Sequence, residues 1–433
     1  MRRLWNRVPG LMAALVLLAV AFLGTGRALA VDRVTLKDGT VVEGTIYQEH
    51  EGYVWIKTTI AGIEQKQYFA PEKIAKVEKG IGAPEAAPAA APAAASAAAA
   101  KSGGAKAPKA LVLSMGDRFN HKDMVGIFMN AHPVEMAIPT LEKELGTDRT
   151  GVLVLRISSG GGSIAEIQPI NDLIHTQLKP RFRTVAWIDS AISAAAMSAL
   201  VCDEIYFTTR GNFGACTGFY GSLDKPVEGF ELEKVLAQME ETSRLGGWDP
   251  ILMRAMQIQQ PVSADIDENG NVKFYPDAHS GAIRVNEEGR ILTLSADLAL
   301  KIKFSRGTAD TLEELTKLMG YQELGWVGEK VKGIAWPVSR AERMQMEFRD
   351  RSFTDQTRLN EYNTKLMANL NAAAQVPKDQ RAKFVGPALD ALEKIKGMVR
   401  NNPNFSWQVF GRPGQLFWDW IAAIEKQARD LLK

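Results

Sequence analysis

Four apolar runs of strand length, each followed by a turn or a helix-like segment, place the strongest limit on what this chain can fold into. They are "ALVLSM", "GVLVLRI", "TVAWI" and "EIYFTT", which begin at residues 110, 151, 184 and 204. Continuous apolar runs are typical of strands that are buried on both faces. Their alternation with helices predicts an α/β core with a mostly parallel sheet, spanning residues 110–324.

The remaining sequence, in a chain of 433 residues, indicates further parts. Residues 31–80 predict a small β-barrel of the SH3-like or Sm-like kind, because Asp38-Gly39 is a hairpin signal and four more β-rich runs follow. Residues 81–109 are an Ala/Pro-rich linker, and residues 325–433 are a helical region. In its last helix, the apolar residues at helical spacing predict a stripe that packs on a neighbouring helix or subunit; they are Leu416, Phe417, Trp420, Ile421 and Ile424.

The first thirty residues have the pattern of a signal peptide. Arginines precede an apolar run over residues 11–23, and Ala28-Leu29-Ala30 is a small-residue cleavage pattern. The run is shorter than the ~20 residues that span a bilayer. We therefore expect an exported, periplasmic or extracytoplasmic protein, with a retained membrane anchor as the alternative.

Charge and cysteine content exclude some classes of function. The formal net charge of +2 supplies no electrostatic reason to expect nucleic acid as a partner. Cys202 and Cys216 are the two cysteines of the chain, and two cysteines do not make a disulfide framework. We expect two buried free thiols rather than a bond between them.

Two turns at the ends of predicted strands have the composition of a ligand or reaction site. The turn "SSGGGS", residues 158–163, lets backbone N–H groups approach a ligand closely. It lacks the lysine of a phosphate-binding loop and the spacing of a dinucleotide fingerprint.

The second turn contains serines. Ser193 is expected in the first turn of a helix, where unpaired N–H groups favour negative charge, Ser190 is expected to cap that helix, and Ser198 to bond back to a carbonyl. The surroundings of Ser193 lack the G-x-S-x-G elbow of α/β-hydrolases. The residues alone therefore leave two roles open for Ser193: a residue of a packed core helix, or a nucleophile.

Three segments taken in order resemble the Clp-protease and crotonase superfamily. They are "VLRISSGGGSIAEI", "VAWIDSAISAAAMSALVCDEIYFTTRGNFGA" and "LTLSADLALKIKFSRGTADTLEEL", within residues 110–320. The resemblance is strongest to signal peptide peptidase A and to the extracytoplasmic domain of NfeD-type serine proteases. It implies a Clp/crotonase-type core and a serine-type peptidase activity on peptides or membrane-protein segments. It further implies a homo-oligomer, a membrane-protein partner and no cofactor or metal.

The resemblance assigns roles residue by residue. Ser193 falls on the nucleophile, while Gly161 and Ala194 fall on the two oxyanion N–H donors. Gly160 departs from the pattern, because the family usually has proline there. This departure loosens the turn but does not remove the donor.

The general base is the open question, because a serine hydroxyl needs a group that takes its proton. Between His175 and His279 the chain has no histidine, so a Clp-type triad is excluded and the lysine of the NfeD pattern is expected. Counting forward from Ser193 reaches Lys234, whereas alignment on the glycine pair that ends the same helix puts Met239 there. A helical wheel places Met239 inward and Lys234 in solvent, which leaves Lys225 in the preceding loop as the other candidate.

Two hypotheses follow for the function. In the first, the chain is an exported serine endopeptidase with Ser193 as nucleophile and Lys234 or Lys225 as base. In the second, it is a catalytically degenerate relative that uses the peptide groove implied by the resemblance to bind proteins or as a scaffold. A crotonase-type acyl-CoA enzyme ranks third, because export separates the chain from cytoplasmic CoA.

Overall fold

The computed structural model describes most of the chain, namely residues 31–37, 41–50, 53–60, 63–69, 73–81, 107–219 and 226–433. The chain divides into two compact units, Met1–Lys101 and Ser102–Lys433. The predicted signal peptide, the Asp38-Gly39 turn, residues 82–106 of the predicted linker (81–109) and Lys225 lie outside the described residues.

The N-terminal unit contains a five-stranded antiparallel sheet. Its strands are β1 (Val31–Leu36), β2 (Val41–His50), β3 (Tyr53–Ile60), β4 (Ile63–Phe69) and β5 (Ile74–Ile81). The order is β4-β3-β2-β1-β5, so the last strand returns to pair with the first. Val34 and Leu36 of β1 pack with Val54 and Ile56 of β3 in a small core. The five predicted strands are therefore present. They form an antiparallel sheet in which β4 and β5 are the two edge strands.

The second unit is built on a seven-stranded sheet. The strands are β6 (Lys109–Met115), β7 (Val152–Ser159), β8 (Arg183–Ile192), β9 (Glu204–Phe207), β10 (Asn212–Gly214), β14 (Thr293–Ser295) and β15 (Gly325–Trp326). The main order is β14-β10-β8-β7-β6-β15, and β9 also pairs with β8. The β10–β14 pair is antiparallel, and the other pairs are parallel. The predicted α/β class with a mostly parallel sheet is confirmed.

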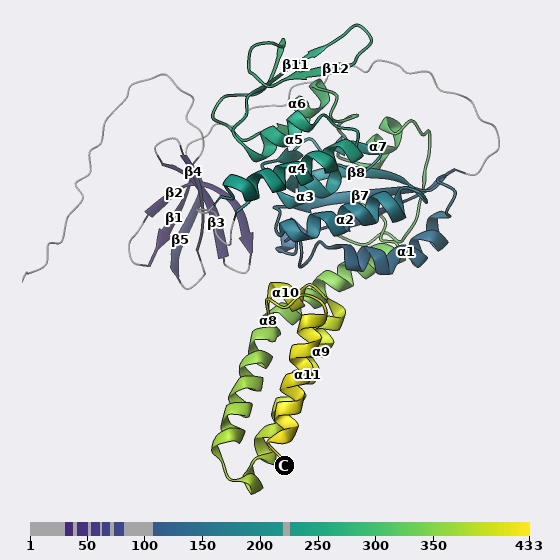
Figure 1. Cartoon of the computed structure of the whole chain (residues 1–433). Helices are drawn as coiled ribbons and strands as arrows, with labels where there is room; N and C mark the ends of the chain where they lie inside the picture. The colour runs from purple at the N-terminus through teal and green to yellow at the C-terminus, as the bar shows by residue number, and fades with distance from the viewer. Residues whose placement is uncertain are drawn as a thin grey trace, which may run out of the picture. The chain divides into compact units, whose positions relative to one another are not determined.

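Both faces of this sheet are buried, which explains the continuous apolar runs. On one face, Leu155 of β7 and its neighbours belong to the core that contains α1 (Ala131–Leu145), α2 (Ile167–Leu173) and α3 (Ala194–Ala199). On the other face, Val154 and Trp187 pack with α7 (Leu312–Leu318). Figure 1 shows α2 and α3 beside strands β7 and β8.

The remaining elements before the C-terminal helices lie after β10. They are α4 (Gly229–Leu245), α5 (Pro250–Gln257), β11 (Val262–Ile266), β12 (Val272–Tyr275), β13 (Ile283–Asn286) and α6 (Ala296–Lys301). Strands β12, β11 and β13 form a separate three-stranded antiparallel sheet in that order.

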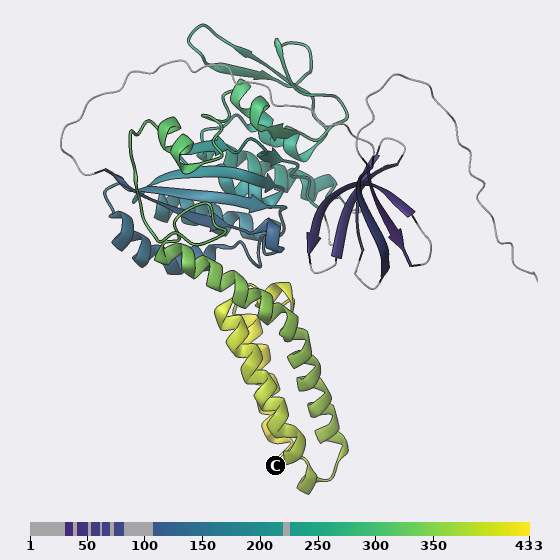
Figure 2. The same ribbon diagram turned by 180° about the vertical axis from the view of Figure 1, so that it is seen from behind.

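Long helices complete the second unit. They are α8 (Arg340–Gln375), α9 (Ala382–Asn401), the short α10 (Phe405–Gln408) and α11 (Gln415–Asp430). Figures 1 and 2 show α8, α9 and α11 side by side, extending away from the sheet. In the part of the chain that the structure describes, no helix has both the length and the apolar composition to cross a membrane.

The predicted stripe of α11 is largely confirmed. Phe417 and Ile421 are buried, and Trp420 and Ile424 pack against the same cluster, which includes residues of α8 and α9. Leu416 is the exception: it is 62% exposed, because at about 100° per residue it lies at the edge of the stripe that is centred on Phe417, Ile421 and Ile424. The stripe therefore packs on neighbouring helices of the same chain.

Candidate active site

Ser193 lies between the end of β8 and the start of α3, as predicted. Its backbone has φ 58° and ψ −128°, a conformation that a residue with a side chain seldom adopts and that costs about 1–3 kcal/mol. Its N–H donates to the Gly214 carbonyl of β10 over 2.8 Å, and its own carbonyl accepts from Ala196 N–H over 3.0 Å. The strand pairing and the helix together hold the strained turn.

The glycine turn lies directly beside Ser193. Gly161 has φ 101° and Gly162 has φ 155°, a region that favours glycine. A Cβ on Gly161 would stand 3.2 Å from Ser193 Oγ and 2.8 Å from the Ile192 carbonyl oxygen. Glycine is therefore required there, both for its conformation and for the space that it leaves to Ser193.

The departure from proline at position 160 has a physical explanation. The N–H of Gly160 donates to Asp123 Oδ2 over 2.8 Å, a bond that proline cannot make. The adjacent Ser159 hydroxyl donates to the Asp123 carbonyl over 2.5 Å, so the turn is held rather than loosened. Asp123 lies far from the turn in sequence, and no sequence pattern pointed to it.

The N–H of Gly161, predicted to hold the oxyanion, already has a partner. It donates to Ser159 Oγ over 3.1 Å. Ala194, the second predicted donor, is the first residue of α3 and is 2% exposed. Helix geometry gives the N–H of a first residue no intrahelical acceptor. An anion beside Ser193 would thus accept a hydrogen bond from the Ala194 N–H. It would compete with Ser159 Oγ for the Gly161 N–H.

The other two serines of this segment have structural roles. Ser198 Oγ donates to the Ala194 carbonyl over 2.9 Å, which confirms the expected back-bond within the helix. The expectation that Ser190 caps α3 is wrong, because Ser190 is a residue of β8. Its hydroxyl accepts from Arg118 Nη1 over 2.8 Å and donates to Asn212 Oδ1 over 3.0 Å.

The lysine candidates do not meet Ser193 in the described structure. Lys234 is exposed on α4, whereas Met239 is 0% exposed and Leu236 is 1% exposed, so the helical wheel is confirmed. Lys225 lies outside the described residues. Within residues 107–219 and 226–433, no hydrogen bond joins a basic side chain to Ser193 Oγ.

The two cysteines are free and buried, which confirms the expected thiols. Burial raises the pKa of Cys202 to about 12 and also raises the pKa of Cys216. The Cys216 thiol lies 3.5 Å from the Ser193 carbonyl oxygen and donates to it. It therefore supports the backbone of the serine turn, a role that the sequence did not indicate.

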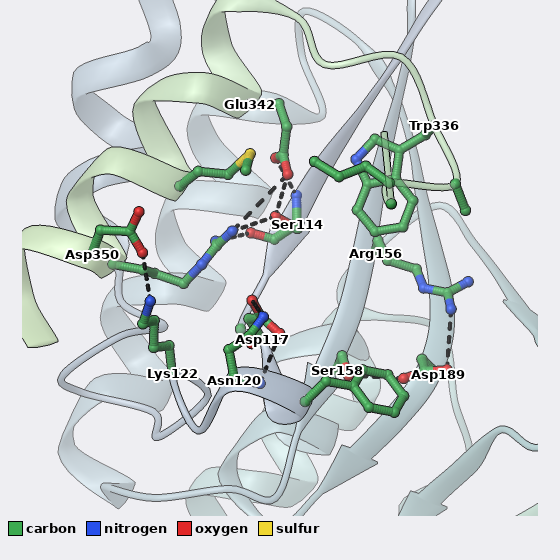
Figure 3. Close-up of a pocket in the computed structure, with 17 residues that line it drawn as sticks. Ser114, Asp117, Asn120, Lys122, Arg156, Ser158, Asp189, Trp336, Glu342 and Asp350 are labelled. Atoms are coloured by element: carbon green, nitrogen blue, oxygen red, sulfur yellow. Dashed lines mark hydrogen bonds and ion pairs between the residues drawn. The ribbon is translucent and has the colours of Figure 1, made fainter. Parts of the chain in front are cut away.

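A cavity of about 620 Å³ lies between the ends of β6, β7 and β8 and the start of α8. Figure 3 shows its charged side chains, which pair with one another: Arg156 with Asp189 over 3.0 Å and Lys122 with Asp350 over 2.6 Å. The Arg156 guanidinium also lies 4.1 Å from the centre of the Trp187 ring. Neither Ser193 nor Gly161 lines this cavity.

The fold and the site together define an α/β protein with a strained serine at a strand-to-helix turn, next to a glycine turn. Comparison with known proteins agrees with the family resemblance. Residues 142–325 match the family model described as NfeD1b, N-terminal domain. This segment contains Gly161 and Ser193, so the resemblance to NfeD-type proteins is confirmed over the candidate site.

One curated relative and two solved structures are similar to the chain. The membrane protein NfeD1b of Bacillus subtilis (strain 168) is 30% identical over 175 residues, which cover 40% of this chain and 34% of that protein. The chain thus aligns with about a third of its relative.

Both solved structures are variants of the 1510-N membrane-bound stomatin-specific protease. Its serine-to-alanine variant has 13% identity and a TM-score of 0.35, covering 54% of this chain and 94% of that one. Its lysine-to-alanine variant, in complex with a substrate peptide, has 14% identity and a TM-score of 0.36, covering 54% and 88%.

Proposed function

We propose that the chain is a serine endopeptidase of the NfeD type. Ser193 Oγ attacks the carbonyl carbon of a peptide bond and its proton passes to a lysine Nζ. The carbonyl oxygen becomes an oxyanion, held by the N–H groups of Gly161 and Ala194. The lysine then protonates the leaving amine, and water releases the acyl group from Ser193 by the reverse steps.

Lys234 does not suit the role of general base, because its side chain is exposed. A lysine acts as a base when burial lowers its pKa, and Lys234 lies in solvent on α4. We propose Lys225, or a lysine from a second copy of the chain, as the proton acceptor. The proposal also includes export from the cytoplasm, a homo-oligomer and peptide segments of membrane proteins as substrates.

The backbone of Ser193 is the observation that carries this proposal. Strained conformations persist where the surrounding structure over-determines them, and they cluster at reaction sites. Ser193 has φ 58° and lies beside a glycine that has no room for a Cβ. Both features are explained if Ser193 is a nucleophile. A packed core helix requires neither feature.

One observation favours the second candidate function, a protein-binding relative without catalysis. The Gly161 N–H is bonded to Ser159 Oγ, so one oxyanion donor is occupied. A chain that keeps the peptide groove implied by the family resemblance and lacks a base would retain peptide binding alone.

A fluorophosphonate probe, which phosphonylates an activated serine with loss of fluoride, separates these possibilities. We expect labelling of the full chain, loss of labelling in Ser193→Ala, and retention in Ser295→Ala, where the serine caps α6 without strain. Labelling that persists in Ser193→Ala overturns the nucleophile.

A casein cleavage assay identifies the base. We expect Lys225→Ala to abolish casein cleavage and the exposed-site control Lys234→Ala to retain it. Peptide binding by a wild-type chain that is neither labelled nor active would instead establish the binding relative.

A further inference from the structure

The glycine turn is held by a second segment of chain in addition to its own contacts. Val125 N–H donates to the Gly161 carbonyl over 3.0 Å, and Ser163 N–H donates to the Val125 carbonyl over 3.0 Å. Together with the two bonds to Asp123, they tie the turn to residues 123–125 along its length. The place of Gly161 next to Ser193 therefore depends on where residues 123–125 lie.

One side chain from the C-terminal helical region bonds on both sides of this arrangement. Asn404 Nδ2 donates to the Gly126 carbonyl over 2.9 Å and to Glu166 Oε2 over 2.6 Å. Gly126 directly follows Val125, and Glu166 follows the glycine turn in the short helix Ile164–Glu166. Glu166 is 4% exposed and also accepts from Ala131 N–H over 2.8 Å.

Neighbours of Asn404 reinforce the same contact. Asn402 is 0% exposed, and its Nδ2 donates to the Ile127 carbonyl over 2.9 Å. Gln408 Nε2 would stand 2.0 Å from a Cβ on Gly126, so the Gln408 side chain uses the space that this glycine leaves open. Residues 402–408 thus pack directly behind the segment that holds the turn.

We infer that Asn404 is a positioning residue, which sets the Gly161 turn relative to Ser193 and makes the C-terminal helices part of the active site. This inference rests on the proposed function for its catalytic meaning. The chain of contacts runs from Asn404 through Gly126 and Val125 to Gly161, and from Asn404 through Glu166 to the other end of the turn. Removing the amide loosens both ends at once.

The test compares Asn404→Ala with Asn369→Ala in the full chain. Asn369 is a matched control, because its amide donates to the Lys365 carbonyl on the exposed side of α8. Hydrogen exchange is measured in peptides that cover residues 159–166, alongside the kinetics of fluorophosphonate labelling. Glu166→Gln weakens the same contact from the other side while keeping the side chain's shape, and serves if Asn404→Ala does not fold.

For Asn404→Ala we expect faster exchange over residues 159–166 with unchanged exchange in residues 152–158 of β7. We also expect a maximal labelling rate lowered about tenfold, a part of the 10²–10³ that one oxyanion donor supplies, at an unchanged half-saturating probe concentration. Glu166→Gln should show the same pattern to a smaller extent, and Asn369→Ala should match the wild type.

Two results overturn the inference: exchange that rises near residues 402–408 but not over 159–166, or a loosened turn with a wild-type labelling rate. A wild-type chain that is not labelled overturns the proposed function instead. The exchange pattern then still decides whether Asn404 holds the turn.

Discussion

At the scale of single residues, the candidate site is a problem of space and backbone conformation. Ser193 occupies a strained φ, and its side chain fills the place that a Cβ on Gly161 would take. Gly160 differs: its φ is not positive, and a Cβ there would meet only Asp123 Oδ2 at 3.6 Å. The two adjacent positions thus have different requirements. Position 161 requires the conformation and the small size of glycine, whereas position 160 requires only a backbone N–H.

This difference predicts opposite outcomes for the same substitution at neighbouring positions. Gly161→Ala should lower the free energy of unfolding by ~1–3 kcal/mol, because a residue with a side chain pays this cost for a positive φ. It should also abolish labelling of Ser193. Gly160→Ala keeps the N–H and should change stability by no more than ~0.5 kcal/mol. Denaturant unfolding and probe labelling measure both. Equal effects at the two positions would contradict the geometry.

The sequence predicted where the serine would lie but not what holds it. Strand and helix patterns placed Ser193 at the turn, because local periodicity determines where β8 ends and α3 begins. The same patterns assigned the cap to Ser190, which the sheet instead retains by pairing it with Ser158 of β7. Asp123 and Asn404 were missed, because their contacts join segments that lie far apart in the sequence.

At the scale of elements, a buried carboxyl group joins the sheet to the longest helix. Glu342 of α8 is 1% exposed and accepts from both the backbone N–H and the hydroxyl of Ser114 in β6. Arg349, about two helical turns after Glu342, donates to the Ser114 carbonyl and hydroxyl over 2.7 Å each. Burial raises the pKa of Glu342, although Arg349 and Ser114 oppose the shift.

A raised pKa makes the contribution of Glu342 to stability depend on pH. The folded state favours the protonated carboxyl, so this contribution is complete below the ordinary value of 4.5 and is lost as pH rises through the raised value. Glu342→Gln removes the titration. Its unfolding free energy relative to the wild type should therefore improve as pH rises from 4.5 towards the raised pKa of Glu342, and level off above that pKa. Urea unfolding at several pH values measures this, and a flat difference would refute the prediction.

Elements that are long and buried were predictable, whereas short ones were not. Strands β6, β7 and β8 follow from their apolar runs because both of their faces are covered. Strands β14 and β15 have three and two residues, too few to show any periodicity, and they form only because neighbouring strands present unpaired edges. Leu416 has apolar spacing in α11 but lies at the edge of the apolar stripe, so it is exposed although the adjacent Phe417 is buried.

At the scale of the whole molecule, each of the two units has a hydrophobic core of its own. Val34, Leu36, Val54 and Ile56 form the core of the N-terminal sheet, and separate clusters stabilise the second unit. The α/β part and the C-terminal helices belong to one unit, joined by contacts such as those of Asn404 and Glu342. The described residues of the candidate site, Ser193 and the glycine turn, thus all lie within the second unit.

Residues 107–433 should therefore fold without the N-terminal unit. We expect the thermal midpoint of this fragment to lie within about 2 °C of the corresponding transition in the full chain, a difference below about 1 kcal/mol. Differential scanning calorimetry of both proteins measures it. A fragment that unfolds at a much lower temperature, or does not fold, would show that the N-terminal unit stabilises the second.

The length of α8 gives its buried end a mechanical consequence. Its 36 residues form a rod of about 54 Å at 1.5 Å per residue, anchored near one end by Glu342 and Arg349. A tilt of only about 5° at that anchor displaces the far end by about 4 Å, on the same rise per residue. The helix is therefore a lever arm, and a spectroscopic label near Gln375 would report rotations at the sheet that are too small to detect at the sheet itself.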